Sequence, residues 1–127
     1  MNFFIEHIGL AASNSTELKN WYERALGARV KWQSDQNPPS YLLTLADGAM
    51  LEIYPANSAD PSRMGDNKLA GFRHLAWRVD SLAKAKVELE TRGVTFTDQI
   101  RPAGGGGQVL FFADAEGNLH HLVERPV

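Results

Sequence analysis

The feature that most constrains the fold is an internal repeat, because two halves of the chain carry the same order of structural patterns. In the first half, an apolar, β-prone segment at 3–10 holds a histidine. A helix pattern follows, with Asn14 and Glu17 as a capping pair and Gly27 at its end. Three further β-prone segments are predicted at 28–33, 41–46 and 49–54. Asp47-Gly48 marks a tight turn between the last two.

The second half repeats this order from residue 72 onwards. The segment 72–79 again holds a histidine, Asp80 or Ser81 begins a helix pattern, and Gly93 ends it. Three further strands are predicted at 95–100, 108–113 and 118–124. A period of about 70 residues is too long for the common solenoids. The repeat therefore predicts an α+β fold of two tandem βαβββ modules, whose eight strands and two main helices form a curled mixed sheet.

The domain organisation follows from the same repeat. A chain of 127 residues fits a single domain, 1–127. We expect the first module at about 3–54 and the second at about 72–124. The segment 55–70 is rich in Ser, Asp, Asn and Pro, which is typical of a linker.

Composition and charge exclude several functions. The net charge is −2 and no long basic block occurs, which disfavours nucleic acid as a partner. No segment approaches the roughly 20 apolar residues of a membrane span, and the first residues do not resemble a signal peptide. The chain has no cysteine, so thiolate metal sites and disulfides are excluded. We expect a cytoplasmic protein.

Four residues are candidate metal ligands, because each module has one suitable side chain on its first strand and one on its last. They are His7 and Glu52 in the first module, and His74 and His121 in the second. Side chains alternate between the faces of a strand, so each pair lies side by side if the two strands are neighbours. A lone histidine is more often structural, but the matched positions favour a four-ligand site. Imidazole and carboxylate suit one divalent transition metal such as Ni, Zn, Co, Fe or Mn.

Residues near these positions suggest further roles. Arg78 shares a face with His74, where it binds a substrate carboxylate or phosphate or forms a salt bridge at the barrel mouth. Tyr54 shares a face with Glu52 and lines the same cavity, either contacting substrate or only packing. His120 and Glu124 point to the opposite face from His121, so we favour a structural role for His120. A register shift of one residue would exchange these assignments, so participation of His120 or Glu124 stays open.

Several motifs along essentially the whole chain resemble the vicinal-oxygen-chelate superfamily. That group includes glyoxalase I, extradiol dioxygenases, fosfomycin-resistance enzymes and bleomycin-binding proteins. The motifs are Glu6–Leu10, Trp21–Ala28, Leu51–Ile53, Arg73–Asp80 and Asp114–Asn118.

The resemblance implies a glyoxalase-type activity, although several residues differ from those of glyoxalase I. Glyoxalase I holds its metal with His, Glu, His and Glu, whereas this chain has His121 at the last position. The implied function is a divalent-metal-dependent lyase or isomerase that acts on a small vicinal-oxygen substrate through a metal-bound enediolate. Glu52 is then the one carboxylate left as the catalytic base. Ala11 and Ala56 stand where glyoxalase I has an arginine and an asparagine for glutathione, which argues against glutathione as a co-substrate.

Two alternatives remain open within this resemblance. An extradiol-type dioxygenase would use Fe(II) and O₂ at the same ligands. A bleomycin-resistance-like protein would bind a drug or metabolite without turnover, but such proteins need no metal ligands. The resemblance also implies a homodimer with sites shared between subunits, in which His7 and Glu52 come from one chain and His74 and His121 from the other. A barrel formed by a single chain is the alternative.

Overall fold

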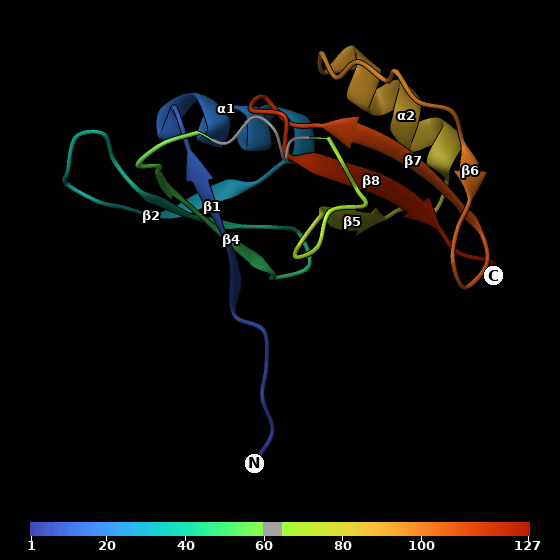
Figure 1. Ribbon diagram of the computed structural model, residues 1–127, viewed down its shortest axis with the longest axis horizontal. Coiled ribbons are helices and arrows are strands. Elements are labelled where there is room, and N and C mark those ends of the chain that lie inside the picture. Colours follow the sequence, from blue (N-terminus) through green and yellow to red (C-terminus); the bar gives the residue numbers. More distant parts are fainter. Residues whose placement is uncertain (60–64) are drawn as a thin grey trace. The chain divides into compact units, whose positions relative to one another are not determined.

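The computed structural model describes residues 1–59 and 65–127, and the chain forms two compact units, Met1–Ala59 and Asp60–Val127 (Figure 1). The boundary falls in the segment 55–70 where the linker is predicted, and residues 60–64 of that segment lie outside the described residues. Within the described part of the chain, no helix has the length and apolar character needed to cross a membrane.

Unit 1 is a four-stranded mixed sheet with one helix. Its sheet has the order β1-β4-β3-β2, in which β1 runs parallel to β4 and the other neighbours are antiparallel. The elements are β1 (His7–Ala12), α1 (Ser15–Leu26), β2 (Arg29–Gln33), β3 (Tyr41–Thr44) and β4 (Met50–Pro55).

Unit 2 repeats this topology. Its sheet has the order β5-β8-β7-β6, in which β5 runs parallel to β8 and the other neighbours are antiparallel. The elements are β5 (His74–Arg78), α2 (Leu82–Thr91), β6 (Arg101–Pro102), β7 (Gln108–Ala113) and β8 (Leu119–Glu124). The fold class predicted from the repeat is confirmed, with two helices and eight strands in two mixed sheets among the residues that the structure describes.

Both helices begin where the capping residues predict. The Asn14 side chain accepts a hydrogen bond from the amide of Glu17 at 3.0 Å, and the Ser81 side chain accepts one from Lys84 at 3.2 Å. These bonds satisfy amides that have no partner within the helix. Helix α1 ends at Gly27, whose φ of 69° is strained for residues with a Cβ.

The core of each unit lies between the helix and one face of the sheet. Helix α1 packs on β4 and β1, and α2 packs on β8 and β7. The alternate side chains of these strands point to the opposite face, which has no helix of its own unit over it. The buried apolar side chains on the helix side include Leu18, Tyr22, Leu43, Leu51 and Ile53 in unit 1, and Leu82, Leu89, Leu110, Phe112 and Leu122 in unit 2.

The duplication extends to the turns before the last strands. In unit 1, the amide of Leu45 donates to the carbonyl of Ala49 at 2.8 Å. In unit 2, the amide of Asp114 donates to the carbonyl of Asn118 at 3.0 Å. In both turns the glycine amide donates back to the carbonyl of the first turn residue, at 3.0 and 3.1 Å. Leu45 and Asp114 therefore occupy equivalent positions.

The first strand of each unit is shorter than predicted. Strand β1 begins at His7, not at residue 3, and β5 begins at His74, not at residue 72. In the parallel register, His7 lies opposite Met50 and His74 lies opposite Leu119. The preceding residues would lie opposite the turn before the last strand, where no extended partner exists.

The strand predicted at 95–100 is wrong. Strand β6 consists only of Arg101–Pro102. The chain bends at Asp98, whose carboxylate forms an ion pair with Arg101 at 2.6 Å across the bend. Pro102 has no amide hydrogen to donate to a strand ladder, which limits β6 further.

Candidate metal-binding site

The first candidate pair lies on the helix-free face of unit 1. Because β1 and β4 are neighbours, with Gly9 opposite Glu52, the side chains of His7 and Glu52 lie on one face. The distance from His7 Nε2 to Glu52 Oε1 is 4.0 Å, and each side chain is 38% exposed. An imidazole and a carboxylate at this separation leave room for a small cation between them.

The second candidate pair has the same register in unit 2. His74 lies opposite Leu119, and His121 lies opposite Ala76. In unit 1, His7 lies opposite Met50 and Glu52 opposite Gly9, which are the equivalent positions. The ring centroids of His74 and His121 are 4.5 Å apart. The Phe111 ring stands edge-on to both, at 5.6 Å from His74 and 4.9 Å from His121. Phe111 thus limits how far either imidazole can turn.

Two residues that the sequence did not single out orient the first histidine of each pair. Glu6 Oε1 lies 2.8 Å from His7 Nδ1, and Asn67 Oδ1 lies 2.7 Å from His74 Nδ1. When Nδ1 donates to such an oxygen, the lone pair remains on Nε2, which is the common arrangement of metal-binding histidines. Glu6 could have been noticed from its position beside His7. Asn67 lies in the predicted linker, where no pattern indicates its partner.

His121 has the electrostatic environment of a neutral ligand. The residue is only 9% exposed, and its Nδ1 is buried without a hydrogen-bond partner among the described residues. Burial lowers the pKa of His121 to about 4, and the positive charges of His74 and Arg125 add to this effect. Metal ligands must be deprotonated to bind, so a neutral imidazole with an unsatisfied nitrogen fits a divalent metal.

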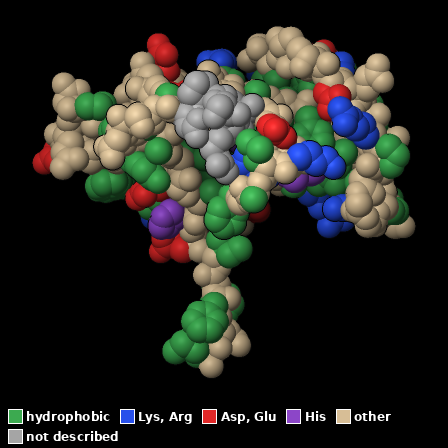
Figure 2. All heavy atoms as spheres, in the orientation of Figure 1, with side chains coloured by type: hydrophobic (Ala, Val, Ile, Leu, Met, Phe, Trp, Pro, Cys, Tyr) green, Lys and Arg blue, Asp and Glu red, His purple; other side chains and the backbone are tan. Residues whose placement is uncertain are grey.

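The structure brings the four predicted ligands together as two pairs. Among residues 1–59 and 65–127, no group of three or more His, Asp or Glu is close enough to hold a metal ion. Each unit supplies two donors, and their union in one centre stays a prediction. Figure 2 shows histidine side chains at the surface beside acidic side chains in one place and beside basic ones in another.

The two predicted substrate-binding residues lie on the same faces as the pairs. Tyr54 follows Glu52 on β4, and its ring lies so close over Gly9 that a Cβ there would be 3.2 Å from Tyr54 Cε1. Arg78 is exposed on the face of β5 that holds His74. Their contact with substrate remains a prediction.

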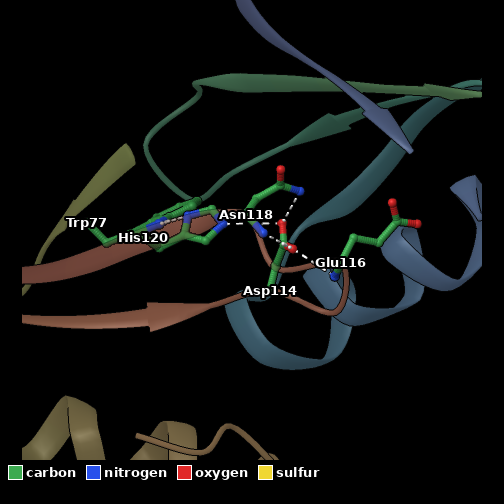
Figure 3. A network of polar contacts seen from close by, with 5 residues as sticks. All are labelled: Trp77, Asp114, Glu116, Asn118 and His120. Atoms are coloured by element: carbon green, nitrogen blue, oxygen red, sulfur yellow. Dashed lines mark hydrogen bonds and ion pairs between the residues drawn. The ribbon is translucent and has the colours of Figure 1, made fainter. Parts of the chain in front are cut away.

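His120 and Glu124 point to the helix side of unit 2. His120 is 1% exposed and contacts Trp77 and Asp114 in a buried polar network (Figure 3). Glu124 Oε1 accepts a hydrogen bond from the amide of Leu82 at 2.7 Å, which caps α2. These contacts are structural and lie on the opposite face of β8 from His121.

Comparison with known proteins gives consistent matches along the chain. The model of the Glyoxalase/Bleomycin resistance protein/Dioxygenase superfamily matches residues 4–122. The YwkD protein of Bacillus subtilis (strain 168) is 31% identical over 113 residues, covering 85% of this chain and 87% of that protein.

Solved structures show the same fold. A glyoxalase family protein from Enterococcus faecalis has a TM-score of 0.81 and 26% identity, over 95% of this chain and 97% of its own. A mutant of the fosfomycin resistance protein FosX from Listeria monocytogenes was crystallised with Mn(II) and 1S,2S-dihydroxypropylphosphonic acid. It has a TM-score of 0.73 and 18% identity, over 100% of this chain and 94% of its own.

Proposed function

Because the chain belongs to the Glyoxalase/Bleomycin resistance protein/Dioxygenase superfamily, we propose that it is a divalent-metal-dependent lyase or isomerase of glyoxalase type. Its substrate would be a small molecule with two neighbouring oxygen atoms. The observation that supports this best is the matched register of the two units, which places a donor pair at equivalent positions in each. The shape of the fold alone does not require four such side chains.

The donor set supports a first-row divalent ion. His7, His74 and His121 offer imidazole nitrogens and Glu52 offers a carboxylate, a set that suits Ni, Co, Zn, Fe or Mn. The Mn(II) in the crystals of FosX supports including manganese. When bound, such an ion would act as a Lewis acid on the substrate oxygens.

The chain's own residues would then move the proton and orient the substrate. Glu52 is the only carboxylate among the four and is partly exposed, so it can take a proton from a substrate carbon and return it to the neighbouring carbon. Arg78 would bind an anionic group of the substrate, and Tyr54 would form a wall over Gly9. Arg78 lies on a different unit from Glu52, so substrate would contact both.

Metal analysis tests this proposal directly. We expect the wild-type protein, reconstituted separately with Ni(II), Co(II), Zn(II), Mn(II) and anaerobic Fe(II), to bind one equivalent of at least one ion per site. Glu52→Gln and His74→Ala should lose it. Glu124→Gln is the matched control, because it changes a carboxylate on the other face of β8, and it should retain the metal. A wild-type protein that stays empty with every ion would contradict the proposal and favour a non-catalytic binding protein.

The identity of the ion and the fate of substrate hydrogen separate the two enzyme classes. A lyase or isomerase should exchange a carbon-bound hydrogen of its substrate with deuterium from the solvent, and Glu52→Gln should abolish this exchange. An extradiol-type dioxygenase would instead require Fe(II) and consume O₂, which an oxygen electrode detects. Oxygen consumption without hydrogen exchange would overturn the isomerase assignment.

We also propose that the enzyme is a cytoplasmic homodimer whose sites combine pairs from two subunits. In its support, large apolar side chains are almost fully exposed just before both first-strand histidines, from 86% at Phe4 to 104% at Phe72. Such surface is usually covered by a partner.

Mixed dimers test the sharing of sites. Neither His7→Ala nor His74→Ala should bind metal alone. Co-expressed together, they should form mixed dimers with one intact site, containing His7 and Glu52 from one subunit and His74 and His121 from the other. Sites formed within one chain would remain broken in every combination, and the mixed dimer would then bind no metal.

A further inference from the structure

The helix side of unit 2 contains a buried polar network directly behind the His74–His121 pair. Trp77 on β5 contacts His120 on β8 at 3.1 Å between Nε1 and Nδ1 (Figure 3). His120 Nε2 lies 3.3 Å from Asp114 Oδ2, in the turn between β7 and β8. His120 is 1% exposed and Asp114 is 7% exposed. The network therefore joins both strands of the histidine pair to the adjacent turn.

The donors and acceptors of this network fix its geometry. The indole of Trp77 can only donate, so His120 Nδ1 is the acceptor and His120 Nε2 carries the hydrogen. That hydrogen is donated to Asp114 Oδ2. The other carboxylate oxygen, Asp114 Oδ1, accepts from the amides of Glu116 and Asn118 at 2.9 and 3.0 Å. One ring orientation of His120 satisfies all of these bonds.

Unit 1 shows that the fold does not need this network. The residues at the equivalent positions are all leucines: Leu10, Leu51 and Leu45. Leu51 is 1% exposed, so it fills the same interior position as His120. Replacing buried polar groups by apolar side chains of similar size is often neutral or stabilising. Stability of the βαβββ module is therefore not a sufficient reason for the polar set in unit 2.

The two candidate ligand pairs also differ in their side chains and in the contact between them. In unit 1, the imidazole nitrogen His7 Nε2 lies 4.0 Å from the carboxylate oxygen Glu52 Oε1. In unit 2, His74 and His121 are two imidazoles whose rings lie side by side, tilted by 38°. No direct bond between their rings holds them at the 4.5 Å separation of their centroids. Besides the bond from Asn67 to His74 and the Phe111 ring beside both imidazoles, the helix-side network supplies a further constraint on the two strands that carry the pair.

We propose that Trp77, His120 and Asp114 form a positioning network that holds the His74 and His121 rings at the separation needed for shared ligand binding. The bond from Trp77 to His120 holds β5 against β8, three residues beyond His74 and one residue before His121. Directional hydrogen bonds define one arrangement of these strands, whereas leucine packing tolerates small shifts. The purpose of the network rests on the metal-binding function proposed above, but its effect on ring geometry can be measured without metal.

Three single variants and one combined variant test this network. Trp77→Phe removes only the indole donor and keeps an aromatic ring. Asp114→Asn places an amide donor against the His120 donor. Phe112→Leu is the matched control, because Phe112 stacks on His120 at 5.3 Å and unit 1 has Leu43 at the equivalent position. The combined variant Trp77→Leu/His120→Leu/Asp114→Leu gives unit 2 the leucines of unit 1.

The first measurement is made on metal-free protein by NMR. We expect clear nuclear Overhauser effects between the His121 ring and the rings of His74 and Phe111 in wild type and in Phe112→Leu. Trp77→Phe, Asp114→Asn and the combined variant should weaken those between His74 and His121. The melting temperature of the combined variant should equal or exceed that of wild type, which a merely structural role would not predict. If Trp77→Phe and the combined variant are folded and show the same effects between His74 and His121 as wild type, the proposal is overturned.

The second measurement is Co(II) titration followed by visible absorption. Loss of groups that orient metal ligands typically weakens binding 10–100-fold, so we expect Trp77→Phe to bind Co(II) roughly tenfold more weakly with an altered spectrum. Phe112→Leu should keep the wild-type spectrum even if it melts earlier. Wild-type spectrum and affinity in Trp77→Phe would overturn the positioning role. A wild-type protein that binds no Co(II) or other ion contradicts the metal-binding function instead, and the ring geometry in metal-free protein still decides the inference.

Discussion

The burial of His121 predicts that protonating one imidazole destabilises the fold at mildly acidic pH. The ordinary pKa of 6.5 is lowered to about 4 in the folded chain, first by burial and then by the charges of His74 and Arg125. Well above pH 6.5 the imidazole is neutral in both the folded and the unfolded chain, so its protonation does not change the stability there. Between pH 6.5 and 4 the unfolded chain binds the proton more readily, so stability falls as the pH falls.

The size of this effect follows from the two pKa values. Each factor of ten in proton affinity corresponds to about 1.4 kcal/mol, so the full loss attributable to His121 is about 3 kcal/mol. Solvent near the imidazole screens part of this effect, so about 3 kcal/mol is its upper limit. Such a loss is a large fraction of the stability of a typical domain.

Urea denaturation of metal-free protein from pH 7.5 to pH 4 measures this loss. His121→Gln, which cannot titrate, is the reference, so the difference between the two proteins isolates the contribution of His121. We expect wild type to lose up to about 3 kcal/mol more than His121→Gln over this range. His74→Gln removes only the second cause and should retain most of the loss. Equal pH dependence of wild type and His121→Gln, or titration of His121 near pH 6.5 by NMR, would refute the reasoning.

Three further predictions concern Gly107, Glu124 and Arg78 in unit 2. Gly107 has a φ of 93°, and the Cβ of Gly107→Ala would clash with the carbonyl oxygen of Glu124, so this variant should lower the free energy of unfolding by about 2 kcal/mol or more. Gly104→Ala is the control, because no atom lies within 4 Å of its Cβ, and it should change the free energy of unfolding little. Thermal denaturation compares the two, and equal losses would contradict the steric argument. Glu124→Ala removes the bond to the amide of Leu82 and should cost about 1 kcal/mol in urea denaturation without loss of metal; metal loss would make Glu124 a ligand. Arg78→Gln should raise KM for an anionic substrate about tenfold or more with little change in kcat or metal content, and an unchanged KM would leave Arg78 with no substrate role.

The sequence predicted the fold well because the main signals are local and occur twice. The caps at Asn14 and Ser81 and the glycine at Gly27 set the helix ends by bonds within a few residues. The neighbouring positions of the first and last strands then placed each ligand pair on one face, since alternation along a strand is fixed. Once the first and last strands are taken as neighbours, the pairing of these candidate ligands follows from the repeat.

What could not be predicted depends on partners that a periodic pattern does not reveal. The β-prone residues before His7 remain unpaired because the segment opposite them turns, and the segment 95–100 bends at Asp98. The bonds of Asn67 to His74 and of Trp77 to His120 span 7 and 43 residues, and neither follows from hydropathy. These unpaired segments and long-range hydrogen bonds depend on tertiary structure and not on the local secondary-structure propensity.

The duplication also shows how one fold can carry two chemically different donor pairs. A module needs only its register and its apolar interior, so the residues on the helix-free face can diverge without changing the fold. Unit 1 carries the carboxylate Glu52, which we propose as the base and which lies 4.0 Å from its own histidine. Unit 2 has acquired His121, whose burial lowers its pKa so far that it stays neutral down to about pH 4. Directly behind this pair, on the helix side of the sheet, the polar residues around His120 stand where unit 1 has leucines, and this contrast is the basis of the positioning role proposed for them.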